Sequence, residues 1–205
     1  KNLNQKYPLI VGGKKIETKE WADSINPSNS SESVGKFALA EYADADNAIK
    51  SALNAFNSWR EVSVEKRAEI LFKAADIMRK KRFELNAVIV LEEGKPWEEA
   101  DGDVSEAIDF LDYYSIEAKK LFIPEKLLSP SGEDNISFYE PRGVSVIISP
   151  WNFPLAILTG MCSASLISGN TAILKPAKQA SIIAYKLMEI LKEAGLPNGV
   201  CNYLP

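Results

Sequence analysis

The fold is decided by residues 149–178, which read SPWNFPLAILTGMCSASLISGNTAILKPAK. The run 144–148 just before them is β-branched and almost entirely apolar, which predicts a strand buried on both faces, and residues 171–174 predict a second buried strand. A helical pattern over 154–168 joins the two strands. Because the links are short, the strands are expected to be parallel and joined by a right-handed crossover. The turn after the first strand and Lys175 after the second therefore lie at the carboxyl ends of the strands, where open α/β sheets bind ligands.

The flanking residues divide the chain into three segments. Residues 1–123 carry a hairpin pattern followed by helical patterns, and residues 124–141 carry a polar turn between alternating residues, typical of an exposed hairpin arm. Residues 142–205 continue the α/β pattern, with a helix over 181–194 and a third strand from Gly199. The sequence therefore predicts an α/β fold that contains a helical layer, the start of a parallel sheet and a protruding β-hairpin.

Several local signals place the boundaries of elements in the first segment. Residues 7–17 predict a β-hairpin with a glycine turn, and residues 24–31 predict a turn. Asp44 and Ser63 each stand where they would cap the start of a helix. Gly94 follows a helical run and has a proline shortly after it, which predicts the end of a helix.

The composition excludes several classes of function. The 205 residues are 46% hydrophobic and 25% charged, as in ordinary globular proteins, and the net charge of −4 gives no general attraction to nucleic acid or anionic membranes. Prolines, Asn152 and Gly160 interrupt the longest apolar stretch, and the first residues lack the apolar run of a signal peptide. With only two cysteines, a cytoplasmic protein is expected. The chain has no histidine, which removes the commonest general base and metal ligand, and no metal site is assigned.

Asn152 is the strongest candidate for a catalytic residue. It follows a strand directly and lies between Pro150 and Pro154, which stiffen the backbone and remove two amide donors. A neutral side-chain amide held in this way can donate to a developing oxyanion at any protonation state. The alternative is a turn asparagine that satisfies nearby backbone groups. The two prolines and the position at the strand end favour the oxyanion donor.

Other reactive side chains have weaker support. Lys175 has two interpretations that spacing alone leaves open: an ammonium that meets a ribose hydroxyl or phosphate, and a solvated loop lysine. Cys162 and Cys201 have no cationic neighbour in sequence and are expected to be buried thiols of ordinary reactivity. The glycine-rich phosphate-binding motifs are absent from the sequence.

A set of motifs spread along the chain resembles the N-terminal part of an aldehyde dehydrogenase. The similarity is greatest to the subgroup that oxidises glutamate semialdehyde, the 1-pyrroline-5-carboxylate dehydrogenases. The matching stretches are Asn26-Pro27, residues 93–96, 106–111, 140–144, 149–154, 168–171 and 174–177. The resemblance implies that residues 1–123 are the N-terminal part of a cofactor-binding domain, that 124–141 form an oligomerisation arm and that 142–205 begin a Rossmann-like NAD(P)-binding sheet.

The resemblance also implies roles for individual residues. Asn152 would be the side-chain half of an oxyanion hole. A nicotinamide cofactor would be held by Ile148, Ser149, Pro150, Trp151, Lys175, Pro176, Ala177 and Lys178. The cofactor would be NAD or NADP, with NAD slightly preferred, although Lys178 stands where NAD-preferring relatives often carry a glutamate that pairs with the ribose. The partners would be a small-molecule aldehyde and, through the arm, further copies of the chain.

In this family a cysteine thiolate attacks the aldehyde, hydride passes to NAD(P), and water activated by a carboxylate hydrolyses the thioester. The resemblance places that cysteine and that carboxylate outside these residues, so the segment alone is expected to be inactive. The alternative is a non-catalytic split subunit or pseudo-enzyme that binds a nucleotide or a partner chain. In both cases the sheet edge after Tyr203 is expected to need covering by further polypeptide.

Overall fold

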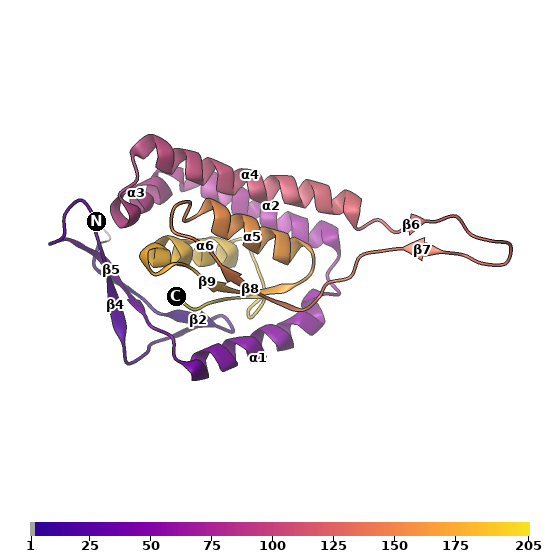
Figure 1. Ribbon diagram of the computed structural model, residues 1–205, viewed down its shortest axis with the longest axis horizontal. Helices are drawn as coiled ribbons and strands as arrows, with labels where there is room; N and C mark the ends of the chain where they lie inside the picture. Colours follow the sequence, from indigo (N-terminus) through magenta and orange to yellow (C-terminus); the bar gives the residue numbers. More distant parts are fainter. Residues whose placement is uncertain (1–2) are drawn as a thin grey trace.

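A five-stranded sheet lies at the centre of the computed structural model, which describes residues 3–205 (Figure 1). Its strands follow the order β3-β2-β10-β9-β8. Strands β8, β9 and β10 run parallel, as predicted, and β2 and β3 form the predicted N-terminal hairpin. The bounds of these strands are β2 (Leu9–Val11), β3 (Lys14–Ile16), β8 (Val144–Ile148), β9 (Thr171–Lys175) and β10 (Cys201–Tyr203).

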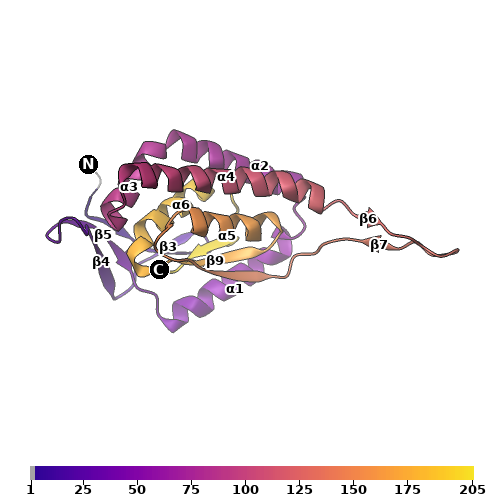
Figure 2. The same ribbon diagram turned by 45° about the horizontal axis from the view of Figure 1, so that its top comes forward.

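Helices cover both faces of this sheet (Figures 1 and 2). Helix α1 packs on one face, α5 packs on the other beside α6, and α2 and α4 form an outer layer over α5 and α6. The helices are α1 (Tyr42–Trp59), α2 (Val64–Lys80), α3 (Arg82–Glu93), α4 (Trp97–Leu121), α5 (Ala156–Ile167) and α6 (Ser181–Glu193), with a 3₁₀ turn η1 (Lys178–Ala180). None of the helices within residues 3–205 is at once long and apolar enough to cross a bilayer.

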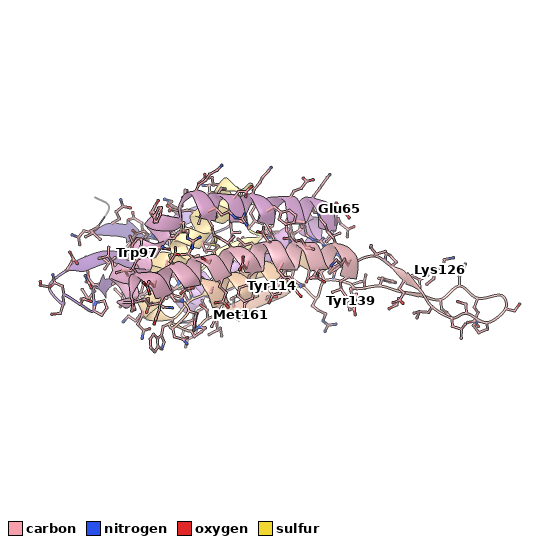
Figure 3. The ribbon with its side chains drawn as sticks, turned by 90° about the horizontal axis from the view of Figure 1, so that it is seen from above. Glu65, Trp97, Tyr114, Lys126, Tyr139 and Met161 are labelled. Carbon is pink, nitrogen blue, oxygen red and sulfur yellow. The ribbon has the colours of Figure 1, made fainter. Side chains whose placement is uncertain are left out.

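Two smaller sheets complete the fold. Strands β1 (Gln5–Tyr7), β5 (Ser33–Ala38) and β4 (Trp21–Ile25) form a three-stranded sheet. Strands β6 (Glu125–Lys126) and β7 (Ile136–Ser137) form the predicted arm, which extends away from the helices. Figure 3 shows Lys126 out on this arm and Tyr139 nearer to its base. Lys1 and Asn2, part of the N-terminal stretch without the apolar run of a signal peptide, lie outside the described residues.

The structure corrects two predictions about the sheet. The edge at Tyr203 is not open, because β2 pairs antiparallel with β10 and aligns Ile10 with Tyr203. The strand β8 is not buried on both faces: Ile147 is buried, whereas Val146 and Ile148 are 56% and 69% exposed. The reason is that α1 packs mainly against β9 and leaves much of β8 uncovered on that face.

The local signals were right at two helix boundaries and wrong at a third. Ser63 caps α2 by accepting a hydrogen bond from the backbone N–H of Lys66, and Gly94 ends α3 in the left-handed conformation with φ of 69°. Asp44 is not an N-cap: Glu41 is, and the Asp44 carboxylate accepts the backbone N–H of Glu41 at 2.9 Å. An acid three residues after the cap completes a capping box, so it gives the same local signal as a cap. The turn predicted over 24–31 begins later, because β4 continues to Ile25.

Cys162 and Cys201 lie in the main apolar core between the sheet and the outer helices, as predicted. Their Sγ atoms are 4.0 Å apart. Contact with the Cys162 thiol and burial raise the pKa of Cys201 well above its usual value. A thiol in this setting stays protonated, so Cys201 is not a ready nucleophile.

The end of α3 carries two acidic side chains with different surroundings. Glu92 is buried and its carboxyl oxygens accept the backbone N–H groups of Ile182 and Ile183, at 2.7 and 2.8 Å, at the start of α6. Desolvation nevertheless raises the pKa of Glu92 to about 8. The half-buried Glu93 has a buried Oε1 without a hydrogen-bond partner, and desolvation, opposed by the charge of Lys95, raises the pKa of Glu93 to about 7.

We predict that Glu93→Gln makes the protein more stable at pH 8 than the unsubstituted protein, by about 1 kcal/mol in the free energy of unfolding. Because the pKa of Glu93 is raised in the folded state, the protonated carboxyl favours folding. This contribution to the free energy of unfolding is fully present below about pH 4.5 and is lost as the pH rises through about 7. The difference between the two proteins should therefore be close to zero at pH 5 and grow towards pH 8. Urea unfolding at both pH values measures it, with the exposed Glu69→Gln on α2 as the control. A difference that does not change with pH would contradict the prediction.

Candidate active site

The structure brings the predicted cofactor residues together in two adjacent loops. Ile148 at the end of β8 is paired in register with Lys175 at the end of β9. Just beyond the strands, the backbone N–H of Ala177 donates to the carbonyl oxygen of Ser149 at 3.1 Å. Residues 148–151 and 175–178 therefore leave the sheet side by side at the carboxyl ends of parallel strands, where ligands bind in open α/β folds.

Asn152 lies in the first of these loops, ahead of α5. The residue is exposed, and within residues 3–205 its side-chain amide makes no hydrogen bond. Pro154 behind it is buried and anchors the turn to the core. The side chain of Asn152 therefore does not have the alternative role of a turn asparagine that hydrogen-bonds nearby backbone groups. The amide is free to donate to a ligand.

Lys95 and Asp103, to which the sequence analysis gave no role, bond to the backbone of this turn and of the start of α5. The Lys95 ammonium donates to the backbone carbonyl oxygen of Asn152 at 2.9 Å and lies 4.4 Å from the centre of the Phe153 ring. Asp103 on α4 accepts the backbone N–H of Ala156 at 2.6 Å and pairs with Lys95 at 3.3 Å. In the sequence, Gly94 and Pro96 predict the end of a helix and residues 93–96 belong to the family resemblance, but neither signal gives Lys95 a role. No local pattern connects it with a turn so far along the chain.

The electrostatics of this cluster depend on burial. The Asp103 side chain is fully buried and that of Lys95 is 12% exposed. Desolvation raises the pKa of Asp103, while the N–H of Ala156 and the ammonium of Lys95 oppose that shift. The carboxyl group therefore depends on these two partners for its charged form.

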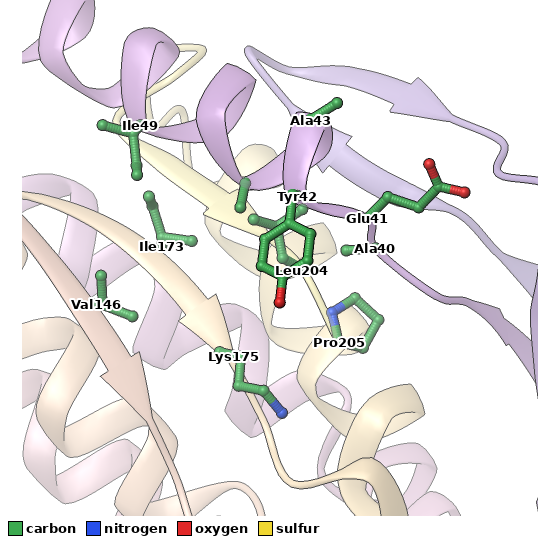
Figure 4. A pocket seen from close by; sticks show the side chains of 11 residues that line it. Ala40, Glu41, Tyr42, Ala43, Ile49, Val146, Ile173, Lys175, Leu204 and Pro205 are labelled. Carbon is green, nitrogen blue, oxygen red and sulfur yellow. The ribbon is translucent and has the colours of Figure 1, made fainter.

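The predicted residues line two different cavities. Lys175 borders a cavity of about 620 Å³ between the start of α1 and the sheet, opposite Tyr42 and close to Pro205 (Figure 4). Trp151 and Lys178 border a second cavity of about 540 Å³, which also contacts the end of α3 and β4. The structure thus separates Lys175 from Trp151 and Lys178, although all three lie near the ends of neighbouring strands.

The two loops contain hydrogen-bonding groups that could bind a nucleotide cofactor. The Ser149 Oγ atom is buried and has no hydrogen-bond partner within residues 3–205. The ammonium of Lys175 donates a long bond, at 3.4 Å, to the carbonyl oxygen of Pro176, and Lys178 is exposed. Hydroxyl-rich riboses and phosphates can satisfy such groups. Over the same residues no group of three or more Cys, Asp or Glu side chains is placed to hold a metal ion.

Comparison with known sequences identifies relatives along almost the whole chain. The chain is 50% identical over 203 residues to the 1-pyrroline-5-carboxylate dehydrogenase of Geobacillus kaustophilus and 48% identical over 203 residues to that of Bacillus subtilis. These alignments cover 99% of this chain and 39% of each relative. The chain therefore spans about two fifths of the length of the curated relatives that it matches.

Solved structures show the same fold. The 1-pyrroline-5-carboxylate dehydrogenase from Thermus with bound NAD matches with a TM-score of 0.96 and 46% identity, over 99% of this chain and 40% of that one. Proline utilization A from Bdellovibrio bacteriovorus matches with a TM-score of 0.97 and 43% identity, over 99% of this chain and 21% of that one. The predicted fold is confirmed by these likenesses. A model of the aldehyde dehydrogenase family matches residues 14–205, and the chain belongs to that family.

Proposed function

We propose that these residues form the N-terminal part of an enzyme that oxidises an aldehyde to a carboxylate with NAD or NADP, and that the aldehyde is glutamate semialdehyde. The relatives that share 48–50% identity with the chain are named for this activity. The observation that carries the proposal is the free amide of Asn152, which stands on a braced turn at the carboxyl end of β8.

In this proposal Asn152 donates a hydrogen bond to the aldehyde oxygen as negative charge develops on it. A fixed donor at about 3 Å from that oxygen lowers the barrier, because it needs no reorganisation during the reaction. The amide is neutral, so its donation does not depend on pH. The nucleophile and the water-activating carboxylate are contributed by polypeptide beyond these residues. Cys162 and Cys201 are buried and lie away from the turn, in the core.

A bound nicotinamide cofactor would supply the hydride acceptor. The chain's own part would be to bind and orient it through the backbone of residues 148–151 and through the ammonium groups of Lys175 and Lys178, which border two separate cavities. Lys178 has only donors to offer, so it cannot accept hydrogen bonds from a ribose diol. We leave both NAD and NADP within the proposal and favour NAD, which is the cofactor in the Thermus structure.

We include in the proposal that the arm 124–141 joins copies of the chain into a homo-oligomer. The arm exposes large apolar side chains, among them Leu128 at 99% and Phe138 at 62%. Such exposure over a segment that extends away from the helices is typical of a surface that a partner covers.

We predict that Asn152→Ala in the full-length enzyme lowers kcat for aldehyde oxidation by about 100- to 1,000-fold, the effect of removing one oxyanion donor. Steady-state kinetics with glutamate semialdehyde and NAD measure this. The melting temperature should change little, because the amide makes no bond within residues 3–205. The control is Asn54→Ala, which removes an exposed side-chain amide on α1. Unchanged turnover in Asn152→Ala would contradict the proposal, and so would turnover by the 205-residue chain alone that Cys162→Ala or Cys201→Ala abolishes.

We predict that Lys178→Glu weakens NADP binding by about 10-fold while NAD binding holds or improves, because a carboxylate accepts ribose hydroxyl hydrogens and repels a 2′-phosphate. Fluorescence titration of the full-length enzyme with each cofactor gives the two dissociation constants. Lys192→Glu, an exposed lysine at the far end of α6, makes the same charge change and should leave both constants unaltered. An equal change for NAD and NADP in Lys178→Glu would place this side chain away from the ribose.

A further inference from the structure

We infer that Lys95 and Asp103 are positioning residues that set the direction in which the Asn152 amide leaves its turn. This inference rests on the proposed function, because it concerns the same oxyanion donor. It assigns to the buried Lys95–Asp103 pair a role in kcat that neither residue would have as a surface ion pair.

The turn cannot hold Asn152 by itself. Proline occupies positions 150 and 154, so two backbone donors are missing from the turn. Within residues 3–205 the backbone bonds that remain nearby are Ala177 to Ser149 and Ile157 to Phe153, and neither involves Asn152. In the part of the chain that the structure describes, the carbonyl oxygen of Asn152 accepts only from the Lys95 ammonium.

A bond to that carbonyl controls the side chain on the same residue. The carbonyl orientation fixes the plane of the peptide that links residues 152 and 153, and this plane is coupled to the backbone angle ψ of Asn152. Rotation about ψ changes how the side chain stands relative to the rest of the turn. The cation also lies over the Phe153 ring at 4.4 Å, so the ammonium contacts two consecutive residues of the turn.

Asp103 in turn fixes Lys95 and the far end of the turn. Its Oδ2 lies 3.3 Å from the Lys95 nitrogen, and its Oδ1 accepts the backbone N–H of Ala156 at 2.6 Å. The carboxylate is fully buried on α4, a helix packed against α2, α3 and α5. The turn is thus tied to a rigid helix at Asn152 through Lys95 and at Ala156 directly.

Removing one member of a buried ion pair leaves an unpaired charge, and that alone can destabilise a protein. The test therefore uses two variants of the full-length enzyme. Lys95→Met removes the bond to Asn152, and the double variant Lys95→Met/Asp103→Asn removes it without an unpaired charge, while the asparagine oxygen can still accept the N–H of Ala156. Lys119→Met is the matched control, since the Lys119 ammonium on α4 likewise lies over an aromatic ring, that of Phe72 at 5.1 Å.

Both variants should lower kcat by about 10- to 100-fold, as expected for a misplaced catalytic group, with the dissociation constant for NAD unchanged. Lys119→Met should keep full activity. The decisive readout is a double-mutant cycle. In a protein that already carries Asn152→Ala, Lys95→Met should lower kcat by less than about twofold, because the effect of Lys95 on kcat passes through Asn152. Lys95→Arg, which keeps a donor cation, should recover part of kcat.

Equal losses from Lys95→Met with and without Asn152 would overturn the inference, and so would unchanged kcat. If Lys95→Met does not fold, the neutral double variant carries the same cycle. The ¹³C resonance of the Asn152 carbonyl reports the bond without any turnover: it should shift in Lys95→Met, and an unshifted resonance would also overturn the inference. An unsubstituted enzyme without aldehyde oxidation would instead refute the proposed function.

Discussion

The parallel pairing of β8 with β9 is the constraint on which the candidate site depends. Its register aligns Ile148 with Lys175, so the two loops that follow start from neighbouring points on one edge of the sheet. The bond from Ala177 to Ser149 keeps the loops together beyond the last paired residues. A slip of one residue would turn each side chain of the strand to the opposite face. The apolar residues that bury this register therefore also determine where the candidate cofactor and catalytic residues lie relative to one another.

The helical layers contribute to the site as directly as the sheet does. The end of α3 and the turn after it carry three side chains that reach other elements: Glu92 binds the start of α6, Glu93 borders the cavity next to Trp151, and Lys95 holds the turn before α5. Gly94 makes this possible, since it ends α3 in a left-handed conformation and places a Pro27 ring atom 2.7 Å from where a Cβ would stand. A short segment remote from the sheet in sequence thereby aligns two helices with the strand-end loops.

Local patterns in the sequence predicted the strands of the central sheet, most helix boundaries and the arm, because each depends on nearby residues. The β-branched run 144–148 marked a strand correctly, yet nothing in it reveals that α1 covers only part of β8. Asp44 was misjudged because a capping box offers two acids with the same local signal. The contact between Lys95 and Asn152 joins residues 57 positions apart, and a separation of this kind is visible only in three dimensions. The sequence therefore indicated candidate site residues at the strand ends, whereas the contacts that α3 and α4 make with the turn of Asn152 were not predictable from it.

The two borders of the central sheet are unequal. The antiparallel hairpin β2–β3 seals the side at β10, whereas β8 presents unpaired backbone groups within residues 3–205 and the exposed side chains of Val146 and Ile148. The sheet ends at β3 and at β8, but β3 carries the exposed Lys14 and Lys15, which oppose pairing at that edge, so a further strand is expected to dock alongside β8. If the 205-residue segment is prepared by itself, the same unpaired edge of β8 is available for pairing with other copies of the segment. Self-association of the isolated fragment at high concentration is therefore expected through β8, the strand that precedes the turn of Asn152.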